Sequence, residues 1–260
     1  MGKGVQGWVV DISKWDPSPN DFCSALSLLP QRQRSFVTRF VRMEDRKQAL
    51  VSRLLQYALV HEVLGIPFDE ITINRTLDGK PYLENDNANF PILISMYTIM
   101  ETVLEFIQNF SSYFSSLEWD NIVNAGSCDG ILAEFYRYWC LKEAYVKAIG
   151  SGLAYGLDKV EFHHTRWTNI SVKINGEDTR EWSFWLFELG KGHWASIARG
   201  HPRSATESYR KTLKGSEYNL EEYHKGLHLP NVDFVSRTVE ELISVLHGEA
   251  YNIPGDKRNT

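Results

Sequence analysis

The chain has 260 residues, of which 43% are hydrophobic and 13% aromatic, and its formal net charge is −5. This composition is that of an ordinary folded protein and excludes a disordered or collagen-like chain. The charge is too small to predict binding to nucleic acid or to an anionic membrane surface. At roughly 150 residues per domain, the length allows one large domain or two small ones.

The cysteines and the apolar stretches indicate the cellular compartment of the protein. Cys23, Cys128 and Cys140 are an odd number without C-x-x-C spacing, so they predict reduced thiols rather than disulfides or a zinc site. The first residues lack the apolar core of a secretory signal, and charged residues interrupt the most apolar stretch, residues 90–110. We therefore expect a cytoplasmic protein with no membrane partner.

The first part of the chain predicts a strand, a long helix and a turn. Residues 7–12 are rich in β-branched and aromatic side chains, as strands are. From 44 to 64, apolar residues recur at three- and four-residue spacing, and Gly65 ends this helix. Residues 70–76 alternate like an edge strand and lead into an Asp78-Gly79 turn.

The second part repeats this order of a helix followed by strands. A helix is predicted over 131–149 and ends at Gly150, and the alternation after it predicts strands at 159–163, 170–174, 182–187 and 193–198. We therefore expect an α+β fold of two similar halves, 1–96 and 97–200. Residues 201–260 are more polar and predict a tail, with one helix at 239–246 behind a Thr238/Glu241 capping box.

Three residues on the second helix and one lysine on a turn are candidates for chemistry. Trp139, Glu143 and Lys147 are spaced by four residues, so they share one helix face. Glu143 and Lys147 can be a surface ion pair, or a carboxylate for a hard cation beside an ammonium for a phosphate. Lys80, in Gly79-Lys80-Pro81, is either part of an ordinary turn or a point charge for a phosphate.

The order of these motifs resembles the 4′-phosphopantetheinyl transferase superfamily, in its larger surfactin-synthetase and aminoadipate types. The resemblance covers about residues 5–200 and rests on FVRMED before the long helix, on GKPYL and on WCLKEAYVKAIGSGL. Its most specific part is W-x-x-K-E-x-x-x-K-x-x-G, formed here by Trp139, Lys142, Glu143, Lys147 and Gly150.

The resemblance implies a pseudo-duplicated fold and an enzyme that moves the phosphopantetheine arm of coenzyme A to a serine of an apo acyl or peptidyl carrier protein. It implies that Glu143 is a catalytic residue and a Mg²⁺ ligand, that Lys147 is catalytic and contacts a phosphate, and that Lys80 binds coenzyme A. An arginine among residues 32–42 would also contact coenzyme A. Because both halves lie in one chain, we expect a monomer.

The chain departs from the family pattern after GKPYL. There the family has an F-N-x-S-H hairpin and a V-G-x-D-x strand, which supply a phosphate-binding histidine and the main metal aspartate. This chain has Met96 at the histidine position and no V-G-x-D-x. We infer an internal deletion that leaves the first half incomplete. Asp86, Asp120 and Asp129 stand outside the matching context.

The deletion predicts impaired transfer, because one protein carboxylate holds Mg²⁺ less well than two. Two alternatives remain open. The chain can be a non-catalytic module that binds a carrier protein or coenzyme A, or an intracellular scaffold in which Glu143 and Lys147 are a surface pair.

Overall fold

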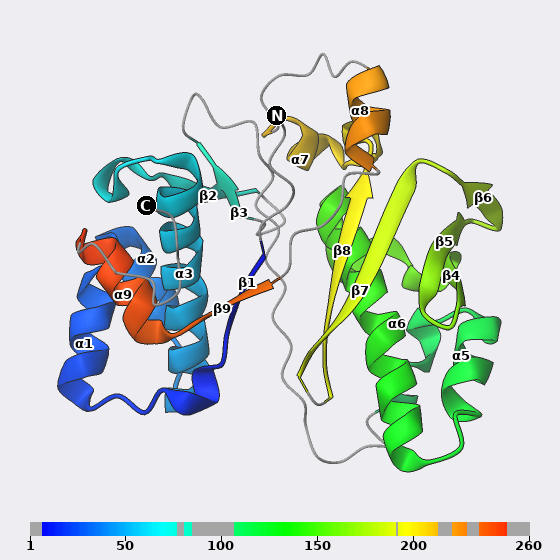
Figure 1. Cartoon of the computed structure of the whole chain (residues 1–260), viewed down its shortest axis with the longest axis horizontal. Helices are drawn as coiled ribbons and strands as arrows, with labels where there is room; N and C mark the ends of the chain where they lie inside the picture. Colours follow the sequence, from blue (N-terminus) through cyan, green and yellow to red (C-terminus); the bar gives the residue numbers. More distant parts are fainter. Residues whose placement is uncertain are drawn as a thin grey trace, which may run out of the picture. The chain divides into compact units, whose positions relative to one another are not determined.

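A computed structural model of the protein describes residues 7–76, 81–84, 107–190, 192–212, 220–227 and 234–248. Helices and strands are mixed along the chain, which confirms an α+β architecture (Figure 1). Packing divides the chain into two compact units, Met1–Thr72 with Asn231–Thr260 and Ile73–Pro230. The Asp78-Gly79 turn, Lys80 and the segment of the inferred deletion lie outside the described residues.

Unit 1 contains residues from both ends of the described chain. Its strands are β1 (Gly7–Val10) and β9 (Phe234–Arg237), and its helices are α1 (Pro19–Ser27), α2 (Gln31–Thr38), α3 (Met43–Leu64) and α9 (Val239–His247). Short 3-10 turns lie at Ile12–Lys14 and Phe68–Glu70. Strands β1 and β9 pair in parallel, with Gly7 opposite Phe234 and Val10 opposite Arg237.

The core of unit 1 forms around α3, whose predicted helix is confirmed. Leu50, Leu54 and Ala58 lie four residues apart and are fully buried. The helix ends where expected, because Gly65 adopts the left-handed conformation with a φ of 67° and donates its N–H to His61. Helix α9 packs beside α3 and buries Leu242 completely (Figure 1).

The described residues after 200 form one strand, β9, and three helices, Glu207–Arg210, Leu220–Leu227 and α9, in a segment for which the sequence predicted a polar tail with one helix. Val239, Leu242 and Leu246 are all buried, although polar residues surround them in sequence. The predicted capping box is confirmed, since Thr238 and Glu241 satisfy each other's backbone N–H groups. An amphipathic helix of this length is stable only against an apolar partner, which here is α3.

Unit 2 consists of helices packed on short antiparallel sheets. The helices are α5 (Ser116–Val123), α6 (Cys128–Ile149), α7 (Glu207–Arg210) and α8 (Leu220–Leu227), with 3-10 turns at Ser111–Tyr113, Gly152–Tyr155, Leu157–Lys159 and Pro202–Ser204. The strands are β2 (Ile73–Arg75), β3 (Pro81–Leu83), β4 (Val160–Thr165), β5 (Thr168–Ile174), β6 (Glu177–Thr179), β7 (Trp182–Gly190) and β8 (His193–Gly200).

The strands of unit 2 pair as three antiparallel sheets, β2-β3, β4-β5-β6 and β7-β8. The strand predictions at 159–163, 170–174, 182–187 and 193–198 are confirmed as β4, β5, β7 and β8. The sequence does not predict strand β6, because its three residues are polar and show no apolar alternation; all three are exposed or only partly buried. Helix α6 packs along β8 and β7 and contributes Phe135, Tyr138, Leu141 and Tyr145 to one continuous apolar core.

Candidate active site

Helix α6 brings Glu143 and Lys147 together. Oε2 of Glu143 lies 3.4 Å from Nζ of Lys147, and the two side chains are 14% and 27% exposed. The predicted ion pair is therefore present, but it is more buried than a pair on an open helix face. A carboxylate and an ammonium in partial shelter can serve a phosphate ligand better than a fully solvated pair, because water screens them less.

Trp139 shares the helix face of this pair but belongs to an aromatic cluster. Its ring meets those of Phe110 and Tyr113 edge-on at 5.1 and 5.9 Å and stacks on Phe135 at 6.0 Å. Such packing fixes one rotamer of the ring. The tryptophan of the sequence signature thus anchors α6 in the core.

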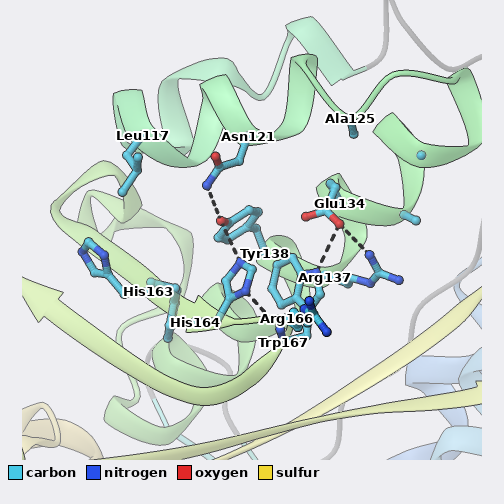
Figure 2. A pocket seen from close by; sticks show the side chains of 13 residues that line it. Leu117, Asn121, Ala125, Glu134, Arg137, Tyr138, His163, His164, Arg166 and Trp167 are labelled. Carbon is cyan, nitrogen blue, oxygen red and sulfur yellow. Dashed lines mark hydrogen bonds and ion pairs between the residues drawn. The ribbon is translucent and has the colours of Figure 1, made fainter.

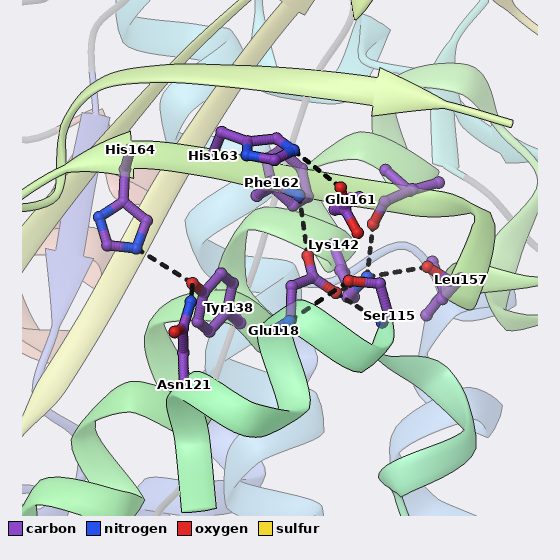
Figure 3. A network of polar contacts seen from close by, with 11 residues as sticks. Ser115, Glu118, Asn121, Tyr138, Lys142, Leu157, Glu161, Phe162, His163 and His164 are labelled. Carbon is purple, nitrogen blue, oxygen red and sulfur yellow. Dashed lines mark hydrogen bonds and ion pairs between the residues drawn. The ribbon is translucent and has the colours of Figure 1, made fainter. Parts of the chain in front are cut away.

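Lys142, the residue before Glu143, forms a fully buried ion pair with Glu118 of α5. Nζ of Lys142 lies 2.7 Å from Oε2 of Glu118, and both side chains are 0% exposed (Figure 3). The ammonium also donates to the carbonyl oxygens of Leu157 at 2.8 Å and Val160 at 2.5 Å. All three ammonium protons therefore have an acceptor.

The carboxylate of Glu118 is satisfied as completely. It accepts the backbone N–H of Phe162 on one oxygen and that of Ser115 on the other, each at 2.9 Å. Burial raises the pKa of Glu118 and lowers the pKa of Lys142, and the attraction between the two charges opposes both shifts. The pair joins α5, α6 and β4 next to Glu143. Sequence reasoning missed Glu118, although Ser115-x-x-Glu118 is a capping-box signal.

Gly150 ends α6 three residues after Lys147 and is closely covered. Its φ is 83°, and a Cβ added there would lie 2.5 Å from Cβ of Tyr209. The N–H of Thr206 donates to the carbonyl of Ile149 at 2.6 Å. The segment with α7 therefore packs on the carboxyl end of α6, and the glycine of the signature is required both for its φ and for this contact.

Two of the arginines among residues 32–42, one of which is expected to contact coenzyme A, have internal contacts in unit 1. Arg34 donates to the carbonyl oxygens of Leu29 and Ser27 at 2.8 and 2.7 Å. The guanidinium of Arg39 lies 5.0 Å from the centre of the Phe40 ring. These contacts hold the turn between α1 and α2 and the end of α2.

As an oxygen donor for a metal ion, α6 offers Glu143. Within the described ranges, no three residues among histidine, cysteine, aspartate and glutamate come together as a metal site. Asp129 lies on the same helix fourteen residues earlier, about 21 Å away along the axis, so it cannot share an ion with Glu143. A carboxylate donor suits Mg²⁺, which takes one or two protein carboxylates and completes its shell with water and substrate phosphates.

Comparison with known protein families identifies the class of protein. The family described as 4′-phosphopantetheinyl transferase, N-terminal, matches residues 13–97, and the 4′-phosphopantetheinyl transferase superfamily matches residues 98–198. The chain belongs to the 4′-phosphopantetheinyl transferase superfamily, whose members are transferases that use coenzyme A and act on carrier proteins. In the described part of the chain, every helix is too short or too polar to cross a bilayer.

Individual relatives are similar along most of their length. The chain is 29% identical to the L-aminoadipate-semialdehyde dehydrogenase-phosphopantetheinyl transferase of Rattus norvegicus, covering 83% of this chain and 82% of the relative. It is 28% identical to the human protein of that name, over 77% and 76%. It is 29% identical to the 4′-phosphopantetheinyl transferase pptA of Paxillus involutus, over 92% and 100%.

These alignments contain more positions than the residues that this chain contributes. The rat alignment has 253 positions, but 83% of 260 residues is about 216, which leaves about 37 positions opposite gaps in this chain. The Paxillus alignment has 276 positions for about 239 residues, which again leaves about 37. Both alignments thus place about the same number of positions opposite gaps in this chain.

Proposed function

We propose that this chain transfers the 4′-phosphopantetheine arm of coenzyme A to a serine of an apo acyl or peptidyl carrier protein, and that its own rate is strongly reduced. The observation that carries the proposal is the partly buried Glu143–Lys147 pair, held on α6 by the residues of the family signature. The remaining parts of the proposal are a cytoplasmic monomer with two similar halves, of which the first is incomplete.

The reaction needs a serine oxygen to form a bond to the β-phosphorus of coenzyme A while the bond to adenosine 3′,5′-bisphosphate breaks. Glu143 would hold Mg²⁺ and accept the serine proton, and Lys147 would neutralise charge on a phosphate oxygen. Bound Mg²⁺ supplies further neutralisation of the pyrophosphate. Lys80, from the GKPYL turn, would bind the nucleotide end of coenzyme A.

The proposed reduction in rate rests on the inferred deletion. About 37 positions opposite gaps in this chain would be enough for a hairpin and a strand, the two elements that the family pattern places after GKPYL. Without the aspartate of that strand, Glu143 would be left with water and phosphate oxygens around the ion, and metal affinity would fall.

Mass spectrometry of a carrier protein tests the proposal. The chain is incubated with coenzyme A, Mg²⁺ and an apo acyl carrier protein, beside a variant that carries the corresponding segment of the rat relative between Phe90 and Tyr97. We expect rapid mass gain with the restored variant, slow gain with the chain itself, and none after Glu143→Gln in either. Equal rates with and without the segment would disprove the impairment.

A binding measurement beside this assay distinguishes the transferase from a binding module. Tight binding of coenzyme A or of the carrier, with no mass gain even in the restored variant, would replace the transfer reaction by the non-catalytic alternative. Loss of Glu143 without any effect on rate in the restored variant would remove that residue from the proposed site.

A further inference from the structure

Unit 2 contains a pocket of about 710 Å³ that the candidate active site does not use (Figure 2). Its walls come from α5, from the first half of α6, and from β4 with the turn that follows it. It is lined among others by Leu117, Glu134, Arg137, Tyr138, Arg166 and Trp167. The volume is in the range of small-molecule sites.

The pocket is separate from the Glu143–Lys147 pair. Glu134 and Glu143 are nine residues apart on α6, which places their side chains on opposite faces of the helix. A ligand in the pocket would therefore not contact the two residues proposed for transfer.

The turn between β4 and β5 holds Arg166 and Trp167 in an unusual conformation at the edge of the pocket. Their φ angles are 50° and 62°, as a two-residue type I′ hairpin requires, but this turn normally takes Asn-Gly. The other hairpin turn of the same sheet has that pair, Asn175 and Gly176. A bulky residue with a positive φ costs about 1–3 kcal/mol, so other contacts must hold it.

Those contacts fix Trp167 as part of the pocket lining. Its backbone N–H donates to Nδ1 of His164 at 3.1 Å, and its ring stacks on the His164 ring at 3.8 Å. The ring also meets Tyr138 edge-on at 4.8 Å, and its Nε1–H donates to Oε1 of Glu134 at 3.1 Å (Figure 2). The strained turn thus holds a rigid indole at the pocket, with the His164 ring stacked on it.

The charges around the pocket do not balance. Glu134 pairs with Arg137 through Nη1 at 2.5 Å, and the Arg137 guanidinium lies against the rings of Trp167 and Trp194. Arg166 is exposed at the turn and makes no ion pair within the described part of the chain. One positive charge at the edge of an aromatic pocket therefore remains without a counter-charge.

The wall formed by α5 is mixed. Leu117 is 44% exposed, which is high for a leucine, and Asn121 lines the same cavity with its amide donating to the Tyr138 hydroxyl at 2.8 Å. An exposed leucine and a fixed indole favour a flat hydrophobic body, and an unpaired guanidinium favours a carboxylate.

We propose that this pocket binds a small organic anion with a ring-containing apolar body, of which an aryl carboxylate is the simplest example. The ring packs on Leu117 beside the Trp167 side chain, and the carboxylate pairs with Arg166. The site is independent of the transfer reaction and is testable without it.

Titration with 2-naphthoate, followed by the NMR signal of the Trp167 indole N–H, tests the proposal. The signal is assigned by its loss in Trp167→Phe. We expect binding with a Kd of about 1 mM or tighter, a shift of this signal, and about threefold weaker binding of the neutral 2-naphthamide. No shift of the Trp167 signal at 5 mM 2-naphthoate, or equal affinity for the amide, would overturn the proposal.

Arg166→Asn removes the proposed charge and keeps the fold, since asparagine is the preferred first residue of a type I′ turn. We expect it to weaken 2-naphthoate about threefold. The control is Arg180→Asn, which removes an exposed arginine from the same unit outside the pocket lining. An equal loss in both variants would show a general charge effect, and no loss in Arg166→Asn would remove the assigned role.

Discussion

Lys142 and Glu118 show how one buried residue pair can hold a helix in place. Two opposite charges without solvent exposure are costly unless every donor and acceptor is satisfied. Here the carboxylate accepts two backbone N–H groups, and the ammonium donates to two carbonyl oxygens, in addition to the contact between the two side chains. The contacts come from α5, β4 and the turn before β4, so they limit rotation of α6 beside Glu143.

Replacing Lys142 by methionine should lower the free energy of unfolding by about 3–5 kcal/mol, because Glu118 then stays buried without its counter-charge. Urea denaturation measures the loss. The double variant Lys142→Met/Glu118→Gln should recover part of it, since a neutral amide is less costly to bury. The matched control is Lys147→Met on the same helix, for which we expect about 1 kcal/mol or less. Equal losses at the two lysines would contradict the structural role.

His164 gives unit 2 a dependence on pH. Burial lowers the pKa of this histidine below its usual 6.5. Its Nδ1 accepts the N–H of Trp167, and its Nε2 lies 3.1 Å from the Tyr138 hydroxyl, so a second proton on Nδ1 would oppose a donor. The unfolded chain therefore binds a proton that the folded chain resists.

Stability should accordingly fall as the pH drops below about 6.5, by less than the about 1.4 kcal/mol per pH unit that a single proton allows. Urea denaturation between pH 7.5 and 5.5 measures the slope. We expect His164→Gln to reduce it, whereas His247→Gln, a change at an exposed position of α9, leaves it unchanged. A slope that is identical in all three proteins would exclude His164 as its source.

At the scale of elements, two glycines that end the long helices make a matched pair. Gly65 after α3 and Gly150 after α6 both have a positive φ, at 67° and 83°. A Cβ on Gly65 would meet no atom within 4 Å, but one on Gly150 would reach Tyr209 at 2.5 Å. Gly65→Ala should cost about 1 kcal/mol from φ alone, and Gly150→Ala clearly more, because α7 must move. Thermal unfolding compares them, and equal losses would show that the Tyr209 contact adds nothing.

The helices that the sequence predicts share a regular apolar period and a clear end. Helices α3 and α6, each of 22 residues, have both features. Helix α9 has a capping box before its apolar face. Helices α1 and α5 have nine and eight residues, too few for a period to stand out, although each begins with a Ser-x-x-acid capping box.

The candidate site was predictable as far as it is local in sequence. Glu143 and Lys147 lie one helical turn apart, so helix geometry alone places them together. Glu118 and Lys142 are 24 residues apart, and only the packing of α5 on α6 brings them into contact. The pocket at Trp167 depends on a turn with two positive φ angles at residues that rarely adopt them, which no residue pattern indicates.

At the scale of the whole molecule, unit 1 depends on residues from both ends of the described chain. Strand β9 pairs with β1, and Arg237 binds Glu62 of α3 at 2.7 Å while its guanidinium lies over the ring of Trp8 at 4.5 Å. Pairing over this sequence distance requires closure of a long loop, whose entropic cost grows only slowly with length. Polarity alone therefore does not show that a late segment is a free tail.

Leu242 tests whether this late segment stabilises unit 1. Its side chain is 0% exposed on the face of α9 that packs on α3, so Leu242→Ala should lower the free energy of unfolding by about 2–5 kcal/mol. Val235→Ala, on β9 with 44% exposure, is the matched control and should cost about 0.5 kcal/mol or less. Urea denaturation compares the two variants with the parent chain. A Leu242→Ala variant as stable as Val235→Ala would mean that α9 contributes no core to unit 1, and the segment after residue 230 would then behave as the tail that its composition predicts.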